Sequence, residues 1–277
     1  MEQPKQETVA EFEGVTLRFE DKTALRDISF GLERGETKIV LGAAGSGKSV
    51  LLKLTMGLLQ ADEGRITVLG NEITREREEN LYELRRHIGM VFQEGALFDS
   101  LTVGENVGYV FERMPAVSAE EAERRVREAL RFVELEHTYD QFPSELSGGM
   151  RRRVAIARAV VGQPELMLYD SPTAGLDPIT AARIMALVVR QRDARQVSSL
   201  LVTHRVQDAF LMARSYYDAR LEKLVAAGNG SSLEETPQGW SFAHTRFLVL
   251  RDGETAFRGS LQELCGQSDP YLQKFLA

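Results

Sequence analysis

Three short stretches of the chain hold residues whose types and spacing suit phosphate and magnesium chemistry. The first is GAAGSGKS at Gly42–Ser49, which directly follows an apolar run and precedes a helical pattern. Its three glycines let the backbone curl so that N–H groups face an anion, and the helix N-terminus adds positive partial charge. In such a loop Lys48 pairs with the β- and γ-phosphates of a nucleotide, and the hydroxyl of Ser49 ligates magnesium. The stretch predicts a phosphate-binding loop rather than a glycine-rich turn with an incidental lysine.

The second stretch, LSGGM at Leu146–Met150, places a serine and two glycines before another helical pattern. The hydroxyl of Ser147 and the N–H groups of Gly148 and Gly149 suit contact with a phosphate. Taken alone, the stretch is equally compatible with a plain helix cap. Its position between the phosphate-binding loop and a strand that ends in aspartate favours the phosphate contact.

The third stretch, LMLYDSPTAGLDP at Leu166–Pro178, begins with an apolar run that ends in Asp170. This pattern is typical of a buried strand that carries a magnesium ligand. The following residue often supplies the base for nucleotide hydrolysis, but here it is Ser171, whose hydroxyl holds a water without taking its proton. We therefore expect nearly normal nucleotide binding and slow hydrolysis.

The elements that position these stretches are short apolar runs of the kind found in strands buried on both faces of a parallel sheet. The runs are Thr37–Gly42, Glu165–Asp170 and Ser199–His204. Helical patterns separate them, so the fold class is predicted as α/β. Before the first run, apolar and polar residues alternate over Glu11–Thr37, which predicts antiparallel strands.

A mostly helical pattern from about residue 95 to residue 161 predicts a helical subdomain inserted between strands of the sheet. Within it, a capping box of Ser118 and Glu121 opens a helix with one apolar stripe. The opposite face of that helix carries Arg and Glu, which indicates a solvated surface.

Residues from about 216 to 244 break the rhythm with Gly, Ser and Pro, and they predict an atypical inserted loop. An alternative is a contact surface for a second subunit or an accessory protein, with Trp240 as its anchor. A hairpin and two short helices follow. We treat residues 1–277 as a single domain.

The composition and charge of the chain limit which partners and which cell compartment we expect. The formal net charge of −7 argues against nucleic acid and anionic lipid as partners, because nonspecific binding to them needs clustered cations. The start has no signal-peptide pattern, and no run approaches the roughly 18 apolar residues of a membrane span. We expect a cytosolic chain that meets a membrane through another protein. Its single cysteine, Cys265, is expected to be a buried residue in a reducing compartment.

Together, GAAGSGKS and LSGGM resemble the nucleotide-binding subunit of ATP-binding cassette (ABC) proteins, and the resemblance covers nearly the whole chain. It implies a P-loop NTPase fold of the ABC type, with ATP and Mg²⁺ as cofactors. It also implies two subunits that face head to tail, so that each ATP lies between the phosphate-binding loop of one and LSGGM of the other. The implied ATP-binding residues are Phe19, Gly42, Ala43, Ala44, Gly45, Ser46, Gly47, Lys48, Ser49, Ser147, Gly148, Gly149 and Asp177.

The resemblance assigns further roles. Phe19 matches the aromatic residue that stacks on adenine, although a phenylalanine in a strand is by default a core residue. Gln93 matches the glutamine that joins the magnesium shell and the attacking water to the helical subdomain. Asp170 matches the aspartate that orders magnesium. AGLD at Ala174–Asp177 matches the loop that crosses the dimer interface, and His204 matches the histidine at the γ-phosphate. The implied catalytic residues are Asp170, Ser171, His204 and Gln93, and the implied magnesium residues are Ser49, Gln93 and Asp170.

Two strings, GALF at Gly95–Phe98 and DPIT at Asp177–Thr180, resemble the cassettes of bacterial Mla-class lipid transporters, which serve Mce-type lipid-binding proteins. This implies a cytoplasmic subunit held on the inner face of the cytoplasmic membrane by an integral permease, whose coupling helix sits beside the Gln93 loop. GALF is also explained as subdomain packing shared by many importers. Arg151–Arg153 matches basic and polar residues on a helix of the family, so nucleic acid is not an expected partner.

Two other functions stay open, namely a soluble ABC ATPase of an assembly or repair machine and a regulatory clamp that dimerises on ATP but scarcely hydrolyses it. Ser171 is the reason to retain the regulatory-clamp interpretation, because the family usually has glutamate at this position. Three explanations account for the serine. The chain pairs with a different cassette that completes the site, it forms a slow homodimer that relies on His204, or the serine was introduced to trap ATP. We favour a natural degenerate site, because glutamine is the closer isostere for a trap. The spacing does not bring Glu94 to the water.

Overall fold

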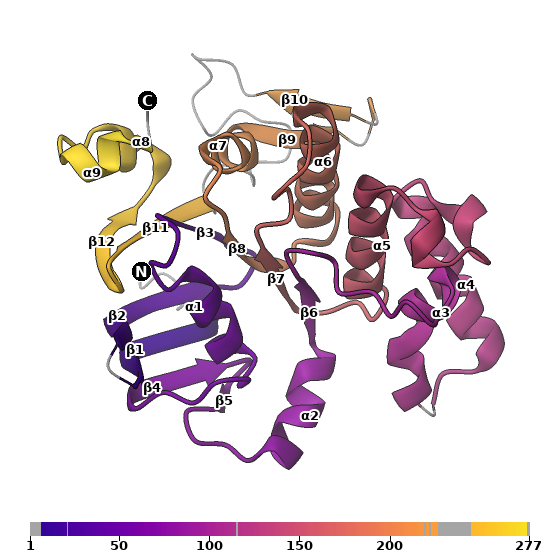
Figure 1. Ribbon diagram of the computed structural model, residues 1–277, viewed down its shortest axis with the longest axis horizontal. Coiled ribbons are helices and arrows are strands. Elements are labelled where there is room, and N and C mark those ends of the chain that lie inside the picture. The colour runs from indigo at the N-terminus through magenta and orange to yellow at the C-terminus, as the bar shows by residue number, and fades with distance from the viewer. Residues whose placement is uncertain are drawn as a thin grey trace, which may run out of the picture.

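The computed structural model describes residues 7–20, 22–114, 116–218, 220–221, 223–226 and 245–275. This part of the chain is built around a six-stranded central sheet with the strand order β12-β11-β3-β8-β7-β6 (Figure 1). In that order the strands are Glu254–Gly259, Thr245–Arg251, Thr37–Gly42, Ser198–Val202, Leu166–Asp170 and Ile88–Val91. Neighbours pair in parallel except for β12, which runs antiparallel at one edge. The three predicted apolar runs are β3, β7 and β8, with bounds that differ from the expected ones by at most two residues.

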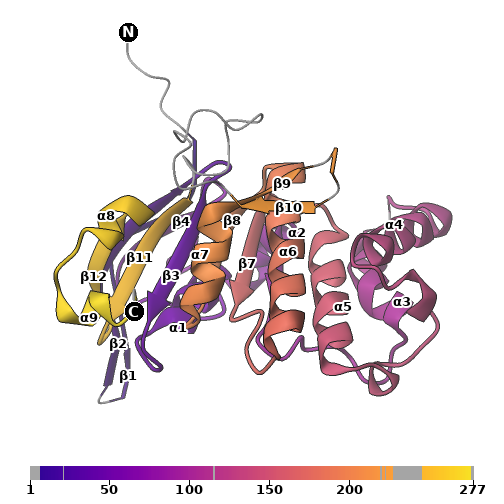
Figure 2. The ribbon, with the colours of Figure 1, turned by 90° about the horizontal axis from the view of Figure 1, so that it is seen from above.

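Alternate residues of the central strands face two separate cores, as expected for strands that are buried on both faces. In β7, Leu166 and Leu168 join the core that contains α1, whereas Met167 and Tyr169 join the core on the opposite face. The helices of that opposite face include α5, α6 and α7, which stand side by side in Figure 2. These four helices are Lys48–Thr55 (α1), Gly148–Val160 (α5), Pro178–Arg195 (α6) and Val206–Arg214 (α7).

A second, antiparallel sheet covers the α1 side and confirms the pattern predicted for the N-terminal part. Its order is β2-β1-β4-β5, with the bounds Lys22–Glu33, Thr8–Phe19, Glu63–Val68 and Asn71–Glu72. On its inner face Phe12 and Phe30 stack across β1 and β2 with their ring centroids 4.6 Å apart. Helix α2, Glu78–Arg86, then leads into β6.

The helical region lies between β6 and β7 in the chain and to one side of the sheets (Figure 1). It contains α3 (Val103–Gly108), α4 (Ala119–Phe132) and α5, together with the 3₁₀ turns Tyr109–Arg113, Glu136–Thr138 and Pro143–Glu145. The inner stripe of α4 is buried in the same core as α5, which matches the predicted apolar stripe.

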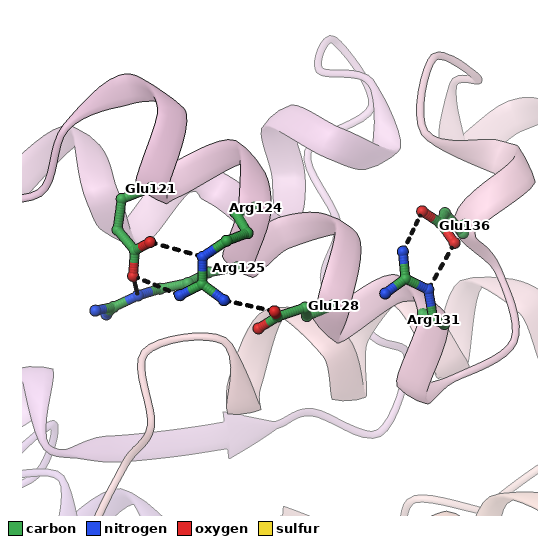
Figure 3. Close-up of polar contacts among 6 residues, drawn as sticks. All are labelled: Glu121, Arg124, Arg125, Glu128, Arg131 and Glu136. Atoms are coloured by element: carbon green, nitrogen blue, oxygen red, sulfur yellow. Dashed lines mark hydrogen bonds and ion pairs between the residues drawn. The ribbon is translucent and has the colours of Figure 1, made fainter.

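The outer face of α4 is a solvated surface of paired charges, as predicted (Figure 3). Ser118 caps the helix by accepting a hydrogen bond from the backbone N–H of Glu121 at 3.2 Å. The Glu121 carboxylate accepts from Arg124 and Arg125 instead of completing a capping box. These two arginines hold the pKa of Glu121 down to about 2. Because the pairs are exposed, each contributes little to stability.

The predicted inserted loop opens with a regular hairpin, β9 (Ser215–Asp218) and β10 (Lys223–Ala226), that packs on α6. A buried ion pair in α6 anchors it: Arg192 donates to the carbonyl of Ser215 at 2.8 Å, and Asp193 accepts from the N–H of Tyr217 at 2.7 Å. Arg190 lies over the Tyr217 ring at 5.1 Å. Residues 227–244, with Trp240 among them, lie outside the described part of the chain.

The described chain closes as predicted, with the β11–β12 hairpin followed by α8 (Leu261–Cys265) and α9 (Pro270–Gln273). The expectation that Cys265 is buried is wrong, because this cysteine is exposed. Leu264 takes the inward position of α8, and the next residue points about 100° away around the helix. Among the described residues, no helix combines the length and apolar character needed to cross a membrane.

Candidate functional site

The phosphate-binding loop joins β3 to α1, as predicted, and two of its glycines have a left-handed backbone, with φ of 76° at Gly45 and 97° at Gly47. A Cβ on Gly47 would lie 2.7 Å from the carbonyl oxygen of Ala24 and against the side chain of Leu25. The β2 strand therefore presses on the loop so closely that only glycine fits at position 47. A Cβ on Gly45 would meet open space, which leaves that side of the loop free for a ligand.

Lys48 folds back over the loop that precedes it. Its ammonium donates to the carbonyls of Gly42 at 3.0 Å and Ala43 at 2.7 Å. Burial lowers the pKa of Lys48, while the nearby carboxylate of Asp170 opposes that shift. The side chain is thus a buried cation beside an open loop, and such a cation suits the pairing of phosphate oxygens.

Asp170 ends β7 and fits a magnesium site. Its Oδ1 is buried and has no hydrogen-bond partner within the described part of the chain. A buried carboxylate oxygen without a partner is costly, and a bound cation removes that cost. Ser49, the other predicted ligand that is fixed on an element, is half-buried in the first turn of α1.

Ser171 follows directly and is almost fully covered, with 6% of its surface exposed. Its backbone has a left-handed φ of 45°, and its N–H donates to the carbonyl of Val202 on β8 at 2.8 Å. The main chain at this position is therefore held by the central sheet. What the position lacks is a carboxylate, because a serine hydroxyl does not act as a general base at neutral pH.

A buried polar cluster behind Ser171 was not anticipated from the sequence. Asp208 of α7 is 3% exposed and accepts hydrogen bonds from the hydroxyls of Thr173 and Thr203. Burial raises the pKa of Asp208, and these hydrogen bonds together with Arg205 oppose that shift. The cluster ties the strand that precedes His204 to the turn that follows Ser171.

Arg205 makes a second connection between the same two segments. Its guanidinium donates to the main-chain carbonyl of Thr173, just before AGLD, at 3.4 Å and to that of Leu176, within AGLD, at 3.3 Å. The exposed His204 precedes it, so this histidine and the AGLD segment are linked through one side chain. The only sequence signal for this role was the position of Arg205 next to the predicted histidine.

Ser147 caps α5, because its Oγ accepts a hydrogen bond from the N–H of Met150 at 3.3 Å. The structure therefore shows the helix cap, and the phosphate contact of Ser147 stays a prediction. A depression of about 370 Å³ opens beside it, lined by Gly149, Asp177, Arg153 and Arg183 among others. Two arginines and a helix N-terminus contribute positive charge to this depression, and Asp177 contributes one carboxylate.

The structure does not bring this depression and the phosphate-binding loop together within one chain. Helix α1 is buried in the core on one face of the central sheet, and α5 is buried in the core on the other face. Figures 1 and 2 both show α5 beyond α6 as seen from α1. The two predicted halves of the nucleotide site thus belong to helices on opposite faces of the central sheet.

The loop that carries the exposed Gln93 is held by arginines of α5. Arg152 is 7% exposed and donates to the carbonyl of Phe92 at 3.0 Å and to that of Ala174 at 3.4 Å. Arg158 donates to the carbonyl of Gly95 at 2.8 Å. One buried guanidinium therefore joins the helix after LSGGM, the Gln93 loop and the AGLD turn.

Two further predicted site residues, Phe19 and Asp177, are exposed and accessible to a ligand or partner. Phe19, at the end of β1, is 46% exposed, so it is not the core residue that its strand position alone suggests. Asp177 caps α6 by accepting from the N–H groups of Ile179 and Thr180. A hydrogen bond with the Thr180 side chain, together with these backbone bonds, holds the pKa of Asp177 below its ordinary value.

The sequence model of the ABC transporter family matches residues 25–174. Among curated relatives, the intermembrane phospholipid transport ATP-binding protein MlaF of Haemophilus influenzae is 32% identical over 227 residues, which cover 82% of this chain and 86% of MlaF. The methionine import ATP-binding protein MetN 1 of Staphylococcus aureus is 39% identical over 205 residues. That match covers 71% of this chain and 59% of MetN 1.

Solved structures with the same arrangement of elements are also ATP-binding cassettes. The dimeric, post-hydrolysis structure of the cassette MJ0796 bound to ADP and Pi has a TM-score of 0.72 and 28% identity, over 91% of this chain and 98% of that one. The cbiO1 protein from Clostridium perfringens, part of the transporter complex cbiONQ, has a TM-score of 0.74 and 26% identity, over 95% of this chain and 93% of that one.

Proposed function

The chain belongs to the ABC transporter family, as an ATPase subunit with the P-loop NTPase fold of the ABC type, and from this premise we propose that it works as one half of an ATP-driven clamp on a lipid permease. The observation that carries the proposal is that Lys48 and Ser147 begin two different helices, α1 and α5, which are buried in the cores on opposite faces of the sheet. A site split in this way is completed by a second subunit arranged head to tail. ATP then lies between the two chains and holds them together.

In this proposal one chain supplies the phosphate-binding half of each site. Gly42–Ser49 wraps the phosphates, with Lys48 at the β- and γ-phosphates, and Phe19 stacks on adenine. Ser49, Gln93 and Asp170 hold Mg²⁺, which neutralises charge on the phosphates when it is bound. The buried and unpartnered Oδ1 of Asp170 supports this assignment. His204, fixed beside the AGLD turn by Arg205, lies at the γ-phosphate.

The second chain supplies the other half. Ser147, Gly148 and Gly149 meet the γ-phosphate of its partner's ATP, and Asp177 stands at the interface. The depression at Ser147 supports this role, because Arg153 and Arg183 give it a positive lining that a phosphate would neutralise. Ser147 is able to do this after closure by exchanging or sharing its capping bond to Met150.

We propose that Ser171 makes hydrolysis slow while ATP binding and closure stay nearly normal. A positioned general base contributes about 10²- to 10⁴-fold in rate, which corresponds to roughly 3 to 5 kcal/mol of barrier. Serine withholds that contribution, whereas the residues proposed to bind ATP are all in place. The same observation favours a second candidate function, a regulatory clamp that dimerises on ATP and scarcely hydrolyses it.

The transported substrate is proposed to be a phospholipid or another hydrophobic molecule. MlaF, the ATP-binding protein of an intermembrane phospholipid transport system, is matched over 86% of its length, whereas the longer MetN 1 is matched over 59%. The GALF and DPIT strings support the same choice. The subunit then lies in the cytoplasm, on the inner face of the membrane, bound to a permease that works with an Mce-type lipid-binding protein and an accessory protein.

The test is ATP turnover of the purified chain alone and with its permease in phospholipid vesicles, with lipid transfer measured in parallel. Transport predicts that turnover rises on addition of the permease and that labelled phospholipid moves only with ATP. Methionine uptake without lipid transfer would refute the lipid assignment. ATP-dependent dimers with turnover that the permease does not change would favour the regulatory clamp.

A further inference from the structure

The C-terminal helix α9 reaches the entry of the phosphate-binding loop through one hydroxyl group. Tyr271 donates this hydroxyl to the carbonyl of Leu250, the penultimate residue of β11, at 2.7 Å. The same oxygen accepts the backbone N–H of Ala43 at 3.2 Å. Figure 2 shows α8 and α9 in yellow beside the β11–β12 hairpin. A residue 228 positions away from Ala43 is thus bonded to the loop.

The aromatic ring of Tyr271 is held on several sides, so its hydroxyl has a defined place. Asp269 caps α9 by accepting the N–H of Tyr271 at 2.7 Å. Arg251 lies over the ring at 5.3 Å and is 3.4 Å from the Asp269 carboxylate. The Phe275 ring meets Tyr271 edge-on at 5.2 Å. These contacts fix the ring without using the hydroxyl.

The place where the hydroxyl binds is mechanically important for the loop. Lys48 holds the carbonyls of Gly42 and Ala43, and Tyr271 holds the N–H of Ala43. A Cβ on Gly42 would lie 2.6 Å from the carbonyl oxygen of Leu250, which is also the acceptor for Tyr271. The first residues of the loop are therefore held between β11, α9 and Lys48, and Gly42 has no room to move closer to β11.

We propose that Tyr271 is a positioning residue for the phosphate-binding loop, through which the C-terminal helices set the affinity of the site for nucleotide phosphates. The inference rests on the proposed function of Gly42–Ser49. Its physical basis is preorganisation, because a loop that is already fixed in its binding shape loses less conformational freedom when phosphate binds. Without the hydroxyl the N–H of Ala43 loses its partner, and the carbonyls that orient Lys48 become free to move.

The variant Tyr271→Phe keeps the ring and removes only the hydroxyl. Of the two hydrogen bonds that this removes, the one from the N–H of Ala43 joins the loop, and its loss predicts dissociation constants for MgATP and MgADP roughly threefold to tenfold weaker than native. Calorimetric titration of the full-length chain measures both constants. Tyr139→Phe is the matched control, because it makes the same chemical change in the helical region beside Arg127, and it is expected to leave both constants within twofold of native.

A second variant separates loop positioning from the packing of the C-terminal helix. Phe275→Leu removes the edge contact on the Tyr271 ring but keeps the hydroxyl, and it is expected to lower the Tm more than it weakens nucleotide binding. Tyr271→Phe is expected to do the reverse. Native-like affinity in Tyr271→Phe, or a loss of affinity that follows the Tm in both variants, would overturn the positioning role. Failure of the native chain itself to bind MgATP would instead overturn the proposed function.

Discussion

Replacing Ser171 with glutamate is the sharpest test of how this subunit uses ATP. The substitution adds the carboxylate that the site lacks and leaves the proposed binding residues unchanged. The main chain at this position is already fixed by the hydrogen bond from its N–H to Val202. The new side chain therefore starts from a defined point next to Asp170 and extends toward the region where the γ-phosphate is proposed to lie.

The expected gain is about 100-fold in turnover, at the lower end of the 10²- to 10⁴-fold range for a general base. At about 1.36 kcal/mol per decade, this is roughly 2.7 kcal/mol of barrier. We choose the lower end because Ser171 is only 6% exposed, so the longer side chain must make room for itself.

The assay is phosphate release at saturating MgATP, together with the ATP dissociation constant of each variant. Two controls isolate the carboxylate: Ser171→Gln has nearly its shape without its basicity, and Ser171→Ala removes the hydroxyl. Both are expected to turn over as slowly as the native chain. Equal turnover of native and Ser171→Glu proteins at equal ATP affinity would refute the claim that position 171 limits catalysis. A Ser171→Ala variant at least tenfold slower than native would show that the serine itself takes part.

Three further predictions test the split site and the fold. Gly47→Ala is expected to weaken MgATP binding at least 100-fold by titration, because its Cβ would lie 2.7 Å from a main-chain carbonyl of β2, and native-like affinity would contradict the close approach. In a Ser171→Glu background, Lys48→Ala and Ser147→Arg chains are each expected to be inactive, whereas an equimolar mixture regains turnover because one site in each mixed dimer is intact. An inactive mixture that still forms mixed dimers would contradict the head-to-tail site. Arg192→Met is expected to destabilise the fold by about 3 to 5 kcal/mol in denaturant unfolding, because Asp193 stays buried without its partner, and a loss below 1 kcal/mol would contradict this role.

The sequence predicted the parts of the fold that rest on local patterns. Strand β3 has the predicted bounds, Thr37–Gly42, because its buried centre, Ile39–Leu41, is apolar, and polar residues at one end and glycine at the other mark its limits. The antiparallel N-terminal sheet was predictable from the alternation of apolar and polar residues over Glu11–Thr37. The phosphate-binding loop is equally local, since its glycines and lysine lie within eight residues.

The contacts that position the site were not predictable in this way, because they join residues far apart in the chain. Thr173 and Asp208 are separated by 35 positions and Tyr271 and Ala43 by 228, and no periodicity records such pairs. The hairpin that opens the inserted segment was also missed. Its strands, SYYD and KLVA, are too short for a clear alternating pattern, and a buried pair in α6, Arg192 and Asp193, holds them in place.

The proposed division of the site between two chains would limit what Ser171 impairs. Ser171 lies beside Asp170 and so belongs to the half of the site that holds the metal and phosphates. Ser147 and Asp177 belong to the half that this chain presents to its partner, and neither depends on position 171 for its place: each caps its own helix. A partner cassette with glutamate at the corresponding position would therefore find a complete complementary half on this chain. In this proposal the serine slows the site that this chain builds around its own phosphate-binding loop, while the residues that complete a partner's site are unaffected.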